Sequence, residues 1–152
     1  MQKQWVHILK NPISAEDKST LVGSLSTLLK SWDSHGKELS ADVVILNDQL
    51  LIIYLDENSI SASGCSVDKL NREISSIINS SKKELADRNM VPLYSGKEIE
   101  FVDRLNIKEM YEQNHITADH SLVDVNATYE VTRGFEQFLV PIHDSWLKNY
   151  IE

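Results

Sequence analysis

The sequence of 152 residues predicts an α+β fold of the ferredoxin-like (split βαβ) type, a two-layer sandwich in which two main helices cover one face of an antiparallel sheet. Two segments carry apolar residues at helical spacing, and four others carry the short apolar runs of strands. These segments follow one another as strand, helix, strand, strand, helix, strand. The length suits one domain, 1–152, with a core at about 5–102 and a C-terminal extension at about 103–152.

The pattern begins with a strand and a long helix. Residues 5–9 form a short apolar run that stops before a proline. Ser14 is a suitable N-cap, and from there apolar residues recur at helical spacing as far as Trp32. We expect this helix to end in the segment 33–36, where Gly36 can adopt the left-handed conformation that closes many helices.

The middle of the chain reads as a hairpin followed by the second helix. Apolar runs at 43–46 and 50–55 flank Asn47-Asp48-Gln49, and Asn and Asp tolerate the positive φ angles of tight turns. After a serine-rich loop at 56–64, apolar residues recur at helical spacing over 67–85. The sequence therefore predicts two antiparallel strands and an amphipathic helix.

The last part of the chain is less regular. Residues 90–94 and 99–102 read as the fourth strand and its hairpin partner, although Pro92 favours an edge position or a bulge for the first of them. We expect a short helix at 107–113, an irregular or extended passage at 121–131 and a terminal helix at 144–151.

The predicted topology brings two distant turns to one end of the sandwich. Crossover connections are short and right-handed, so the turn after the first helix and the loop before the second helix share that end. Trp32, His35 and Gly36 should therefore be neighbours of the segment 63–66. Asp87-Arg88, read as a pair at the far end of the second helix, should lie at the opposite end.

Composition and charge narrow the classes of partner and location. A formal net charge of -8, with scattered lysines and arginines, disfavours nucleic acid and anionic membrane surfaces as partners. The N-terminus lacks the apolar core of a signal peptide, no apolar run is long enough to span a bilayer, and a single cysteine excludes an internal disulfide. A cytoplasmic location is expected, and no metal or cofactor signature is present.

Cys65, the only cysteine, stands where the second helix should begin. Unpaired N–H groups and the positive end of the helix dipole favour a thiolate there. Cys65 is therefore a candidate nucleophile, with His35 as base and Asp68 or Asp56 as the group that orients it, in a thiol-dependent enzyme or a redox-responsive protein. In the alternative interpretation Cys65 is a small buried residue, and Gly64 and Ser66 supply the turn and the cap.

A second hypothesis needs no reaction. The backbone N–H groups of residues 64–67 form a cradle for a small anion, and binding alone would then be the function. The candidate ligand-binding residues are Trp32, Gly36, Ser63, Gly64, Ser66 and Asp68. A third hypothesis, based on fold analogy, makes the domain an interaction module for a protein partner, with a homodimer as one form.

Other unusual residues have simpler interpretations. His115 and His120 lie in a polar stretch with Asp119, and without a helix to align them they are better read as surface residues than as metal ligands. Trp32, at the end of an apolar stripe, is most simply a core residue, although the topology places it beside the candidate site.

Four short motifs resemble those of a small uncharacterised family of bacterial proteins of about 150 residues, found in Bacteroidetes-type genomes. Residues 32–39 match a Trp-x-x-His-Gly-x-x-Leu pattern, and residues 62–68 match Ala-Ser-Gly-Cys-Ser-Ile-Asp with Val67 in place of Ile. Asp87-Arg88 and Ser145-Trp146 match two later pairs. Where the family has a His and an Arg after that Trp, this chain has residues 147–149, Leu-Lys-Asn, which argues against chemistry in the terminal segment.

Members of this family often carry the automatic label "ABC transporter ATPase", which the residues do not support. Such an ATPase needs Gly-x-x-x-x-Gly-Lys-[Ser/Thr] to cradle phosphates and a downstream acidic residue for magnesium. The sequence contains no such motif. The resemblance therefore implies no activity, and ATP hydrolysis of that type is not expected.

Overall fold

The computed structural model describes residues 2–56, 62–126 and 134–152. The chain divides into two compact units, Met1–Leu85 and Ala86–Glu152. Each unit has a hydrophobic core cluster of its own. The single-domain organisation expected from the length stays a prediction.

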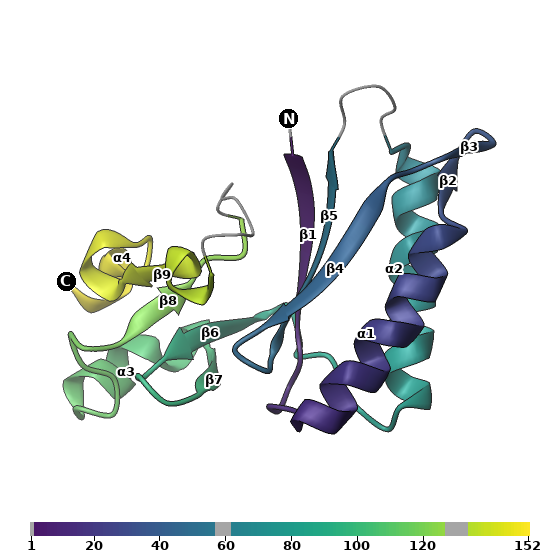
Figure 1. Ribbon diagram of the computed structural model, residues 1–152. Helices are drawn as coiled ribbons and strands as arrows, with labels where there is room; N and C mark the ends of the chain where they lie inside the picture. The colour runs from purple at the N-terminus through teal and green to yellow at the C-terminus, as the bar shows by residue number, and fades with distance from the viewer. Residues whose placement is uncertain (1, 57–61, 127–133) are drawn as a thin grey trace. The chain divides into compact units, whose positions relative to one another are not determined.

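Unit 1 combines an antiparallel sheet with two long helices, and its elements can be followed in Figure 1. The three-stranded sheet has the order β1-β5-β4, with every neighbouring pair antiparallel. The helices α1 and α2 pack their buried residues in one cluster with residues of this sheet. In chain order the elements are β1 (Gln2–Ile8), α1 (Ala15–Lys30), β2 (Asp33–Ser34), β3 (Lys37–Glu38), β4 (Ala41–Leu46), β5 (Leu50–Asp56) and α2 (Gly64–Ser80).

Helix α1 begins where its capping residue predicts. The Ser14 side chain accepts a hydrogen bond from the N–H of Asp17 at 3.1 Å, which satisfies one of the unpaired donors of the first turn. Leu21, Leu25 and Leu29 are buried on the face that meets the core. The predicted helix and its N-cap are therefore confirmed.

The predicted end of α1 is wrong, because the helix stops at Lys30 and the segment 33–38 forms a small hairpin. His35 and Gly36 at its tip have φ angles of 53° and 79°. Positive φ at both central residues is the geometry of the tight turn that suits a two-residue hairpin. The apolar stripe therefore extends to Trp32, two residues beyond the end of the helix at Lys30.

The hairpin of β4 and β5 forms as predicted, with Asn47 and Asp48 at φ of 52° and 55° in its turn. Strand β5 lies between β1 and β4, which is the order the first three strands of a split βαβ would take. The predicted fourth strand, 90–94, belongs to a second sheet. Between α2 and the end of unit 1, the described residues pair with the rest of that unit through an isolated bridge, Leu85 with Leu9.

Helix α2 is capped by Ser63, not by Ser66 as the structural interpretation of this segment had it. Ser63 has extended backbone angles, and its side chain accepts from the N–H of Ser66. Leu70, Ile74 and Ile78 are fully buried along one face, and each such side chain contributes about 1.5–3 kcal/mol by leaving water. The helix ends at Ser80, so Leu85 lies beyond it.

Unit 2 is built on a four-stranded antiparallel sheet with the order β7-β6-β8-β9. Its strands are β6 (Met90–Tyr94), β7 (Ile99–Asp103), β8 (Ser121–Val123) and β9 (Leu139–Pro141). Its helices are α3 (Ile107–Glu112) and α4 (Lys148–Ile151), with 3₁₀ turns at Arg104–Asn106, Phe135–Phe138 and Ile142–Asp144. The α+β class with antiparallel sheets is thus confirmed.

The edge position expected for β6 from Pro92 is wrong, because β6 is a central strand of its sheet. It lies between β7 and β8, but β8 pairs only with Leu93 and Tyr94, whereas β7 pairs with the whole of β6. A proline has no N–H to donate to a second neighbour, so a central strand can hold one only where the ladder on one side is missing. Pro92 lies where the ladder to β8 is absent.

The remaining predictions for unit 2 hold in part. The short helix α3 is confirmed, and three residues of the passage predicted as irregular or extended form the strand β8, in agreement with the extended alternative. Residues 127–131 of that passage lie outside the described residues. The terminal helix is shorter than the predicted 144–151, because the extended backbone at Ser145 interrupts it and α4 begins only at Lys148.

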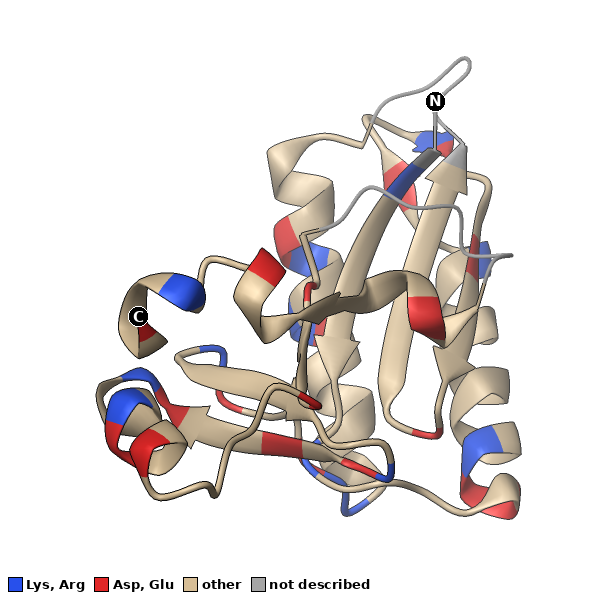
Figure 2. Ribbon diagram, turned by 90° about the vertical axis from the view of Figure 1, so that its left-hand side faces the viewer, with Lys and Arg blue, Asp and Glu red and all other residues tan. Residues whose placement is uncertain are grey.

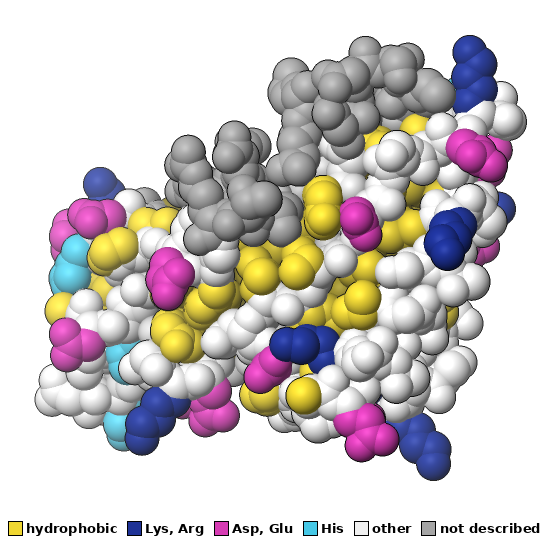
Figure 3. All heavy atoms as spheres, in the orientation of Figure 1, with side chains coloured by type: hydrophobic (Ala, Val, Ile, Leu, Met, Phe, Trp, Pro, Cys, Tyr) yellow, Lys and Arg dark blue, Asp and Glu magenta, His cyan; other side chains and the backbone are white. Residues whose placement is uncertain are grey.

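Charged residues of both signs are scattered along the ribbon and over the face drawn in Figure 3, as Figures 2 and 3 show. Within the described ranges, no helix combines the length and the apolar character that crossing a membrane requires.

Candidate functional site

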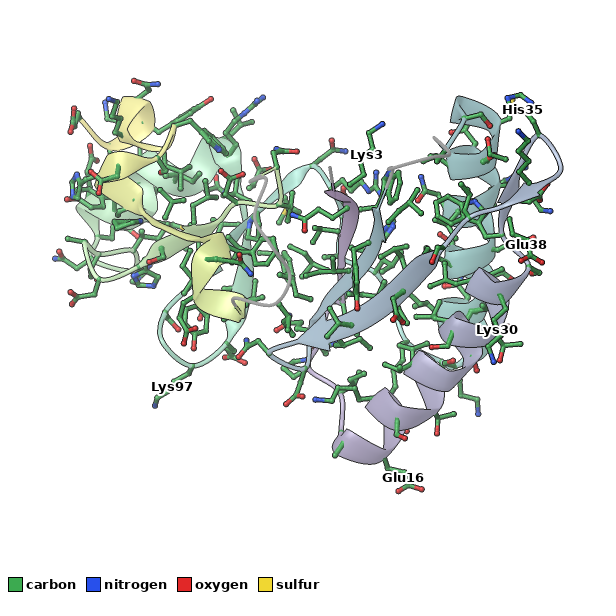
Figure 4. All side chains as sticks on the ribbon, turned by 45° about the horizontal axis from the view of Figure 1, so that its top comes forward. Lys3, Glu16, Lys30, His35, Glu38 and Lys97 are labelled. Carbon is green, nitrogen blue, oxygen red and sulfur yellow. The ribbon has the colours of Figure 1, made fainter. Side chains whose placement is uncertain are left out.

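The candidate site lies where the β2–β3 hairpin meets the first turn of α2. The N–H of Ser63 donates to the Ser34 hydroxyl at 3.2 Å, and the indole Nε1–H of Trp32 donates to the carbonyl of Ser66 at 2.9 Å. Figures 1 and 4 both show the hairpin beside this end of the helix, and Figure 4 labels His35 at the tip of the hairpin. The predicted proximity of the two distant segments is confirmed.

Trp32 holds the hairpin and does not face solvent. Its side chain is 4% exposed and belongs to the core cluster of unit 1. Its ring meets that of Trp5 edge to face, with centroids 5.5 Å apart, an arrangement worth about 0.5–1.5 kcal/mol beyond the buried area. The core interpretation and the placement beside the site both apply to Trp32, because its ring packs inward while its N–H bonds to α2.

The first turn of α2 leaves two backbone donors open. The N–H of Ser66 bonds to the Ser63 hydroxyl at 3.2 Å, and that of Val67 bonds to the Ser63 carbonyl at 3.0 Å. Within the described part of the chain, the N–H groups of Gly64 and Cys65 donate to no protein atom, and both residues are exposed. The cradle predicted over residues 64–67 thus narrows to these two amides.

Electrostatics at this turn favour negative charge. The first turn of α2 carries no acidic residue, so nothing in it offsets the positive end of the helix dipole. Asp68, exposed in the next turn, is the nearest carboxylate along the helix. Lys37 is exposed on the hairpin that meets this end of the helix.

Cys65 and His35 are both exposed, so the alternative in which Cys65 is a buried structural residue is wrong. Among the described residues, no hydrogen bond joins the two side chains. A nucleophile and its base need such a contact, although it can tighten only when substrate binds. The catalytic roles of these two residues stay a prediction.

The other predicted site residues divide by exposure. Ser66 is 8% exposed, and its hydroxyl lies 2.7 Å from that of Ser63. The hydrogen bond between the two hydroxyls stabilises the turn and leaves little of Ser66 accessible to a ligand. Gly36, Gly64 and Asp68 are exposed and accessible to a ligand. Their roles as ligand contacts are unchanged as predictions.

Ser34 is the residue that sequence reasoning missed. It is 2% exposed, and its hydroxyl accepts the bond that joins the hairpin to the start of α2. A His-Gly pair between short polar segments is compatible with a hairpin and also with the end of a helix, so the sequence carries no signal that singles out Ser34.

Two further expectations concern unit 2. His120 Nδ1 accepts a hydrogen bond from the N–H of Thr117 at 3.1 Å, which fixes a local turn. No group of three His, Cys, Asp or Glu residues suited to a metal occurs in the residues that the structure describes. Asp87-Arg88 is not a pair at the end of α2, because that helix ends at Ser80 and the pair precedes β6 in unit 2.

Comparison with known proteins identifies no relative of this chain at a significant level. No protein-family model matches the chain, and neither a curated protein nor a solved structure matches it significantly.

Proposed function

We propose that the protein binds a small anionic ligand at the N-terminus of α2. The observation that carries this proposal is the pair of exposed N–H groups of Gly64 and Cys65, which have no partner among the described residues, in a turn whose other donors are satisfied. Two neighbouring amides suit two oxygens of a carboxylate or phosphate group.

The electrostatic setting supports an anion. The end of a helix carries the equivalent of about half a positive charge, which stabilises a bound anion by about 0.3–1 kcal/mol when exposed and by more when the site is partly covered. The exposed Lys37 of the hairpin offers a further cationic group next to this turn, while Asp33 and Glu38 of the same hairpin carry negative charge. The bonds of Trp32 and Ser34 to the segment 63–66 hold the amides in place before a ligand arrives.

Substitution at Gly64 tests the proposal, because a proline there removes one of the two donors. Proline is favoured at the first helical position, and Ser63 with φ -76° and ψ 161° has the backbone that precedes a proline. Gly64→Ala is the matched control, since it keeps the N–H and its Cβ would meet no atom within 4 Å.

We expect phosphate, sulfate and small carboxylates to raise the melting temperature of the wild type and of Gly64→Ala, but not of Gly64→Pro. The melting temperature of ligand-free Gly64→Pro should equal or exceed that of the wild type, because a compatible proline restricts the unfolded chain. Equal stabilisation of all three proteins by these anions would contradict the proposal.

A thiol-dependent reaction at Cys65 is the second candidate, favoured by the exposure of this residue in the first helical turn. It predicts that iodoacetamide alkylates Cys65 faster at neutral pH than it alkylates a free thiol, and that His35→Ala slows the reaction. An alkylation profile that follows an ordinary thiol pKa in both proteins would remove this candidate.

The finer classification of the fold is also a proposal. The order β1-β5-β4 with two helices in one core supports a split βαβ that lacks its fourth strand among the described residues of unit 1. We also propose that the protein is cytoplasmic and belongs to the family that the four motifs resemble. We further propose that it binds a protein partner or a second copy of itself. Light scattering over a concentration series tests self-association, and ATP hydrolysis of the ABC type remains unsupported.

A further inference from the structure

Unit 2 contains a cavity of about 610 Å³ whose lining residues all belong to that unit. This volume falls in the range of about 300–1,000 Å³ that is typical of sites for small molecules. The cavity uses none of the residues of the α2 site, so its function is independent of the anion site proposed above.

The cavity opens where β6 and β8 separate. The two strands pair at Leu93 and Tyr94, and the ladder stops at Pro92. The segment 90–92 of β6 and the segment 123–126 that continues β8 then form two walls of the cavity. A proline inside the central strand thus coincides with a gap in the sheet.

The polar lining carries groups of both signs. Three carboxylates, Asp87, Asp103 and Asp124, share it with two guanidinium groups, Arg88 and Arg104, which gives a formal sum of 2 − 3 = −1. A ligand with a strong charge of either sign would therefore meet repulsion as well as attraction.

Each of these carboxylates is held by its own turn. Oδ1 of Asp87, Asp103 and Asp124 accepts the backbone N–H two residues further on, at 2.8, 2.9 and 3.0 Å. In the described part of the chain, the second oxygen of each carboxylate accepts no hydrogen bond, so it can still accept one from a ligand.

The apolar lining includes the two large hydrophobic side chains that stand out as exposed among the described residues. Leu105 is 81% exposed and Trp146 is 47% exposed. An exposed indole offers a flat apolar face and an N–H donor to a ligand. The later motif pairs, Asp87-Arg88 and Ser145-Trp146, contribute three side chains to this one cavity.

We propose that this cavity binds a neutral polyhydroxylated ligand, a sugar ring or a short saccharide. Each hydroxyl both donates and accepts, so it can bond to a carboxylate, an amide and a guanidinium in the same site. The C–H face of a sugar ring is apolar and suits the face of Trp146. A neutral molecule avoids the penalty that the mixed charges impose on an ion.

The test measures saturation-transfer NMR on the full chain with glucose, N-acetylglucosamine, maltose and cellobiose, each at up to about 10 mM, which detects dissociation constants in the millimolar range. At least one sugar should bind, and Trp146→Ala should weaken that binding about tenfold, whereas Trp146→Phe keeps an aromatic face and weakens it less. Asp103→Asn should also weaken it, because the turn survives but the carboxylate is lost.

Gly64→Pro is the control, since it should leave sugar binding unchanged while it removes anion binding at α2. The inference is overturned if none of the four sugars binds, or if binding is the same in Trp146→Ala. It is also overturned if sulfate or methylguanidinium binds in this cavity, as judged by loss in Trp146→Ala, while the sugars do not.

Discussion

Replacing Ser34 by alanine should loosen the hairpin from the first turn of α2. The Ser34 hydroxyl is the acceptor for the N–H of Ser63 at 3.2 Å, and Ser34 is 2% exposed, so water cannot readily take its place. The substitution removes one oxygen atom and little volume. Its effect should therefore come almost entirely from the donor left without a partner.

The size of this effect follows from the hydrogen bond and its burial. A net hydrogen bond contributes about 0.5–1.5 kcal/mol, and leaving a buried donor unpaired costs about 1–3 kcal/mol. Since Ser63 is only partly buried, we expect the free energy of unfolding to fall by about 1–2 kcal/mol. For a chain of this length that corresponds to a melting temperature lower by about 2–8 °C.

Urea denaturation followed by circular dichroism measures this loss, with Ser40→Ala as the matched control because Ser40 is exposed and close in sequence. The control should stay within about 0.5 kcal/mol of the wild type. Hydrogen exchange at the amide of Ser63 should accelerate in Ser34→Ala only. If Ser34→Ala is as stable as Ser40→Ala, the hairpin does not support the helix start in the way described.

Three other measurements address charge and cooperativity. Lys83 Nζ lies 2.8 Å from Asp17 Oδ2, and its hydrogen bond and charge hold the pKa of Asp17 below the usual 3.8, so Lys83→Gln should raise that pKa in an NMR titration. Because the folded-state pKa of Asp17 is lowered, the stabilisation by this pair is present above the unfolded pKa and is lost as pH falls through the folded pKa, below pH 3.8. If the pKa of Asp17 does not respond to Lys83→Gln, the pairing is refuted. Burial first, and then the neighbouring Asp42, raise the pKa of Tyr54 above 10.0, so Asp42→Asn should lower it only in part in an ultraviolet titration, and no change would exclude the influence of Asp42. Calorimetry should show a single transition if the chain is one domain, whereas two separate transitions would mean that units 1 and 2 unfold independently.

Local patterns predicted most of unit 1 because each element there depends on nearby residues. The N-cap Ser14 and the Asn47-Asp48 turn act within their own segments, so sequence alone identifies them. The approach of Trp32 to the segment 63–66 followed from topology, since short crossovers leave few alternatives.

The errors arise where one residue pattern serves two structures. A glycine after polar residues suits the end of a helix and also a tight hairpin, and the sequence at 33–36 does not distinguish them. Pro92 excludes a full ladder on both sides but permits a central strand beside a gap. That gap, and the cavity that it opens, depend on β8 and Trp146, which lie far along the chain, so sequence periodicity carries no signal for them.

A titration of the labelled protein with sodium sulfate, followed by amide chemical shifts against sodium chloride at equal ionic strength, is the most direct test of ligand binding at α2. In the wild type, the account predicts saturable shifts that are largest at the amides of Gly64 and Cys65. In Gly64→Pro, it predicts no such shift at the amide of Cys65. Shifts spread evenly over the surface, with Gly64 and Cys65 unmoved, would contradict it.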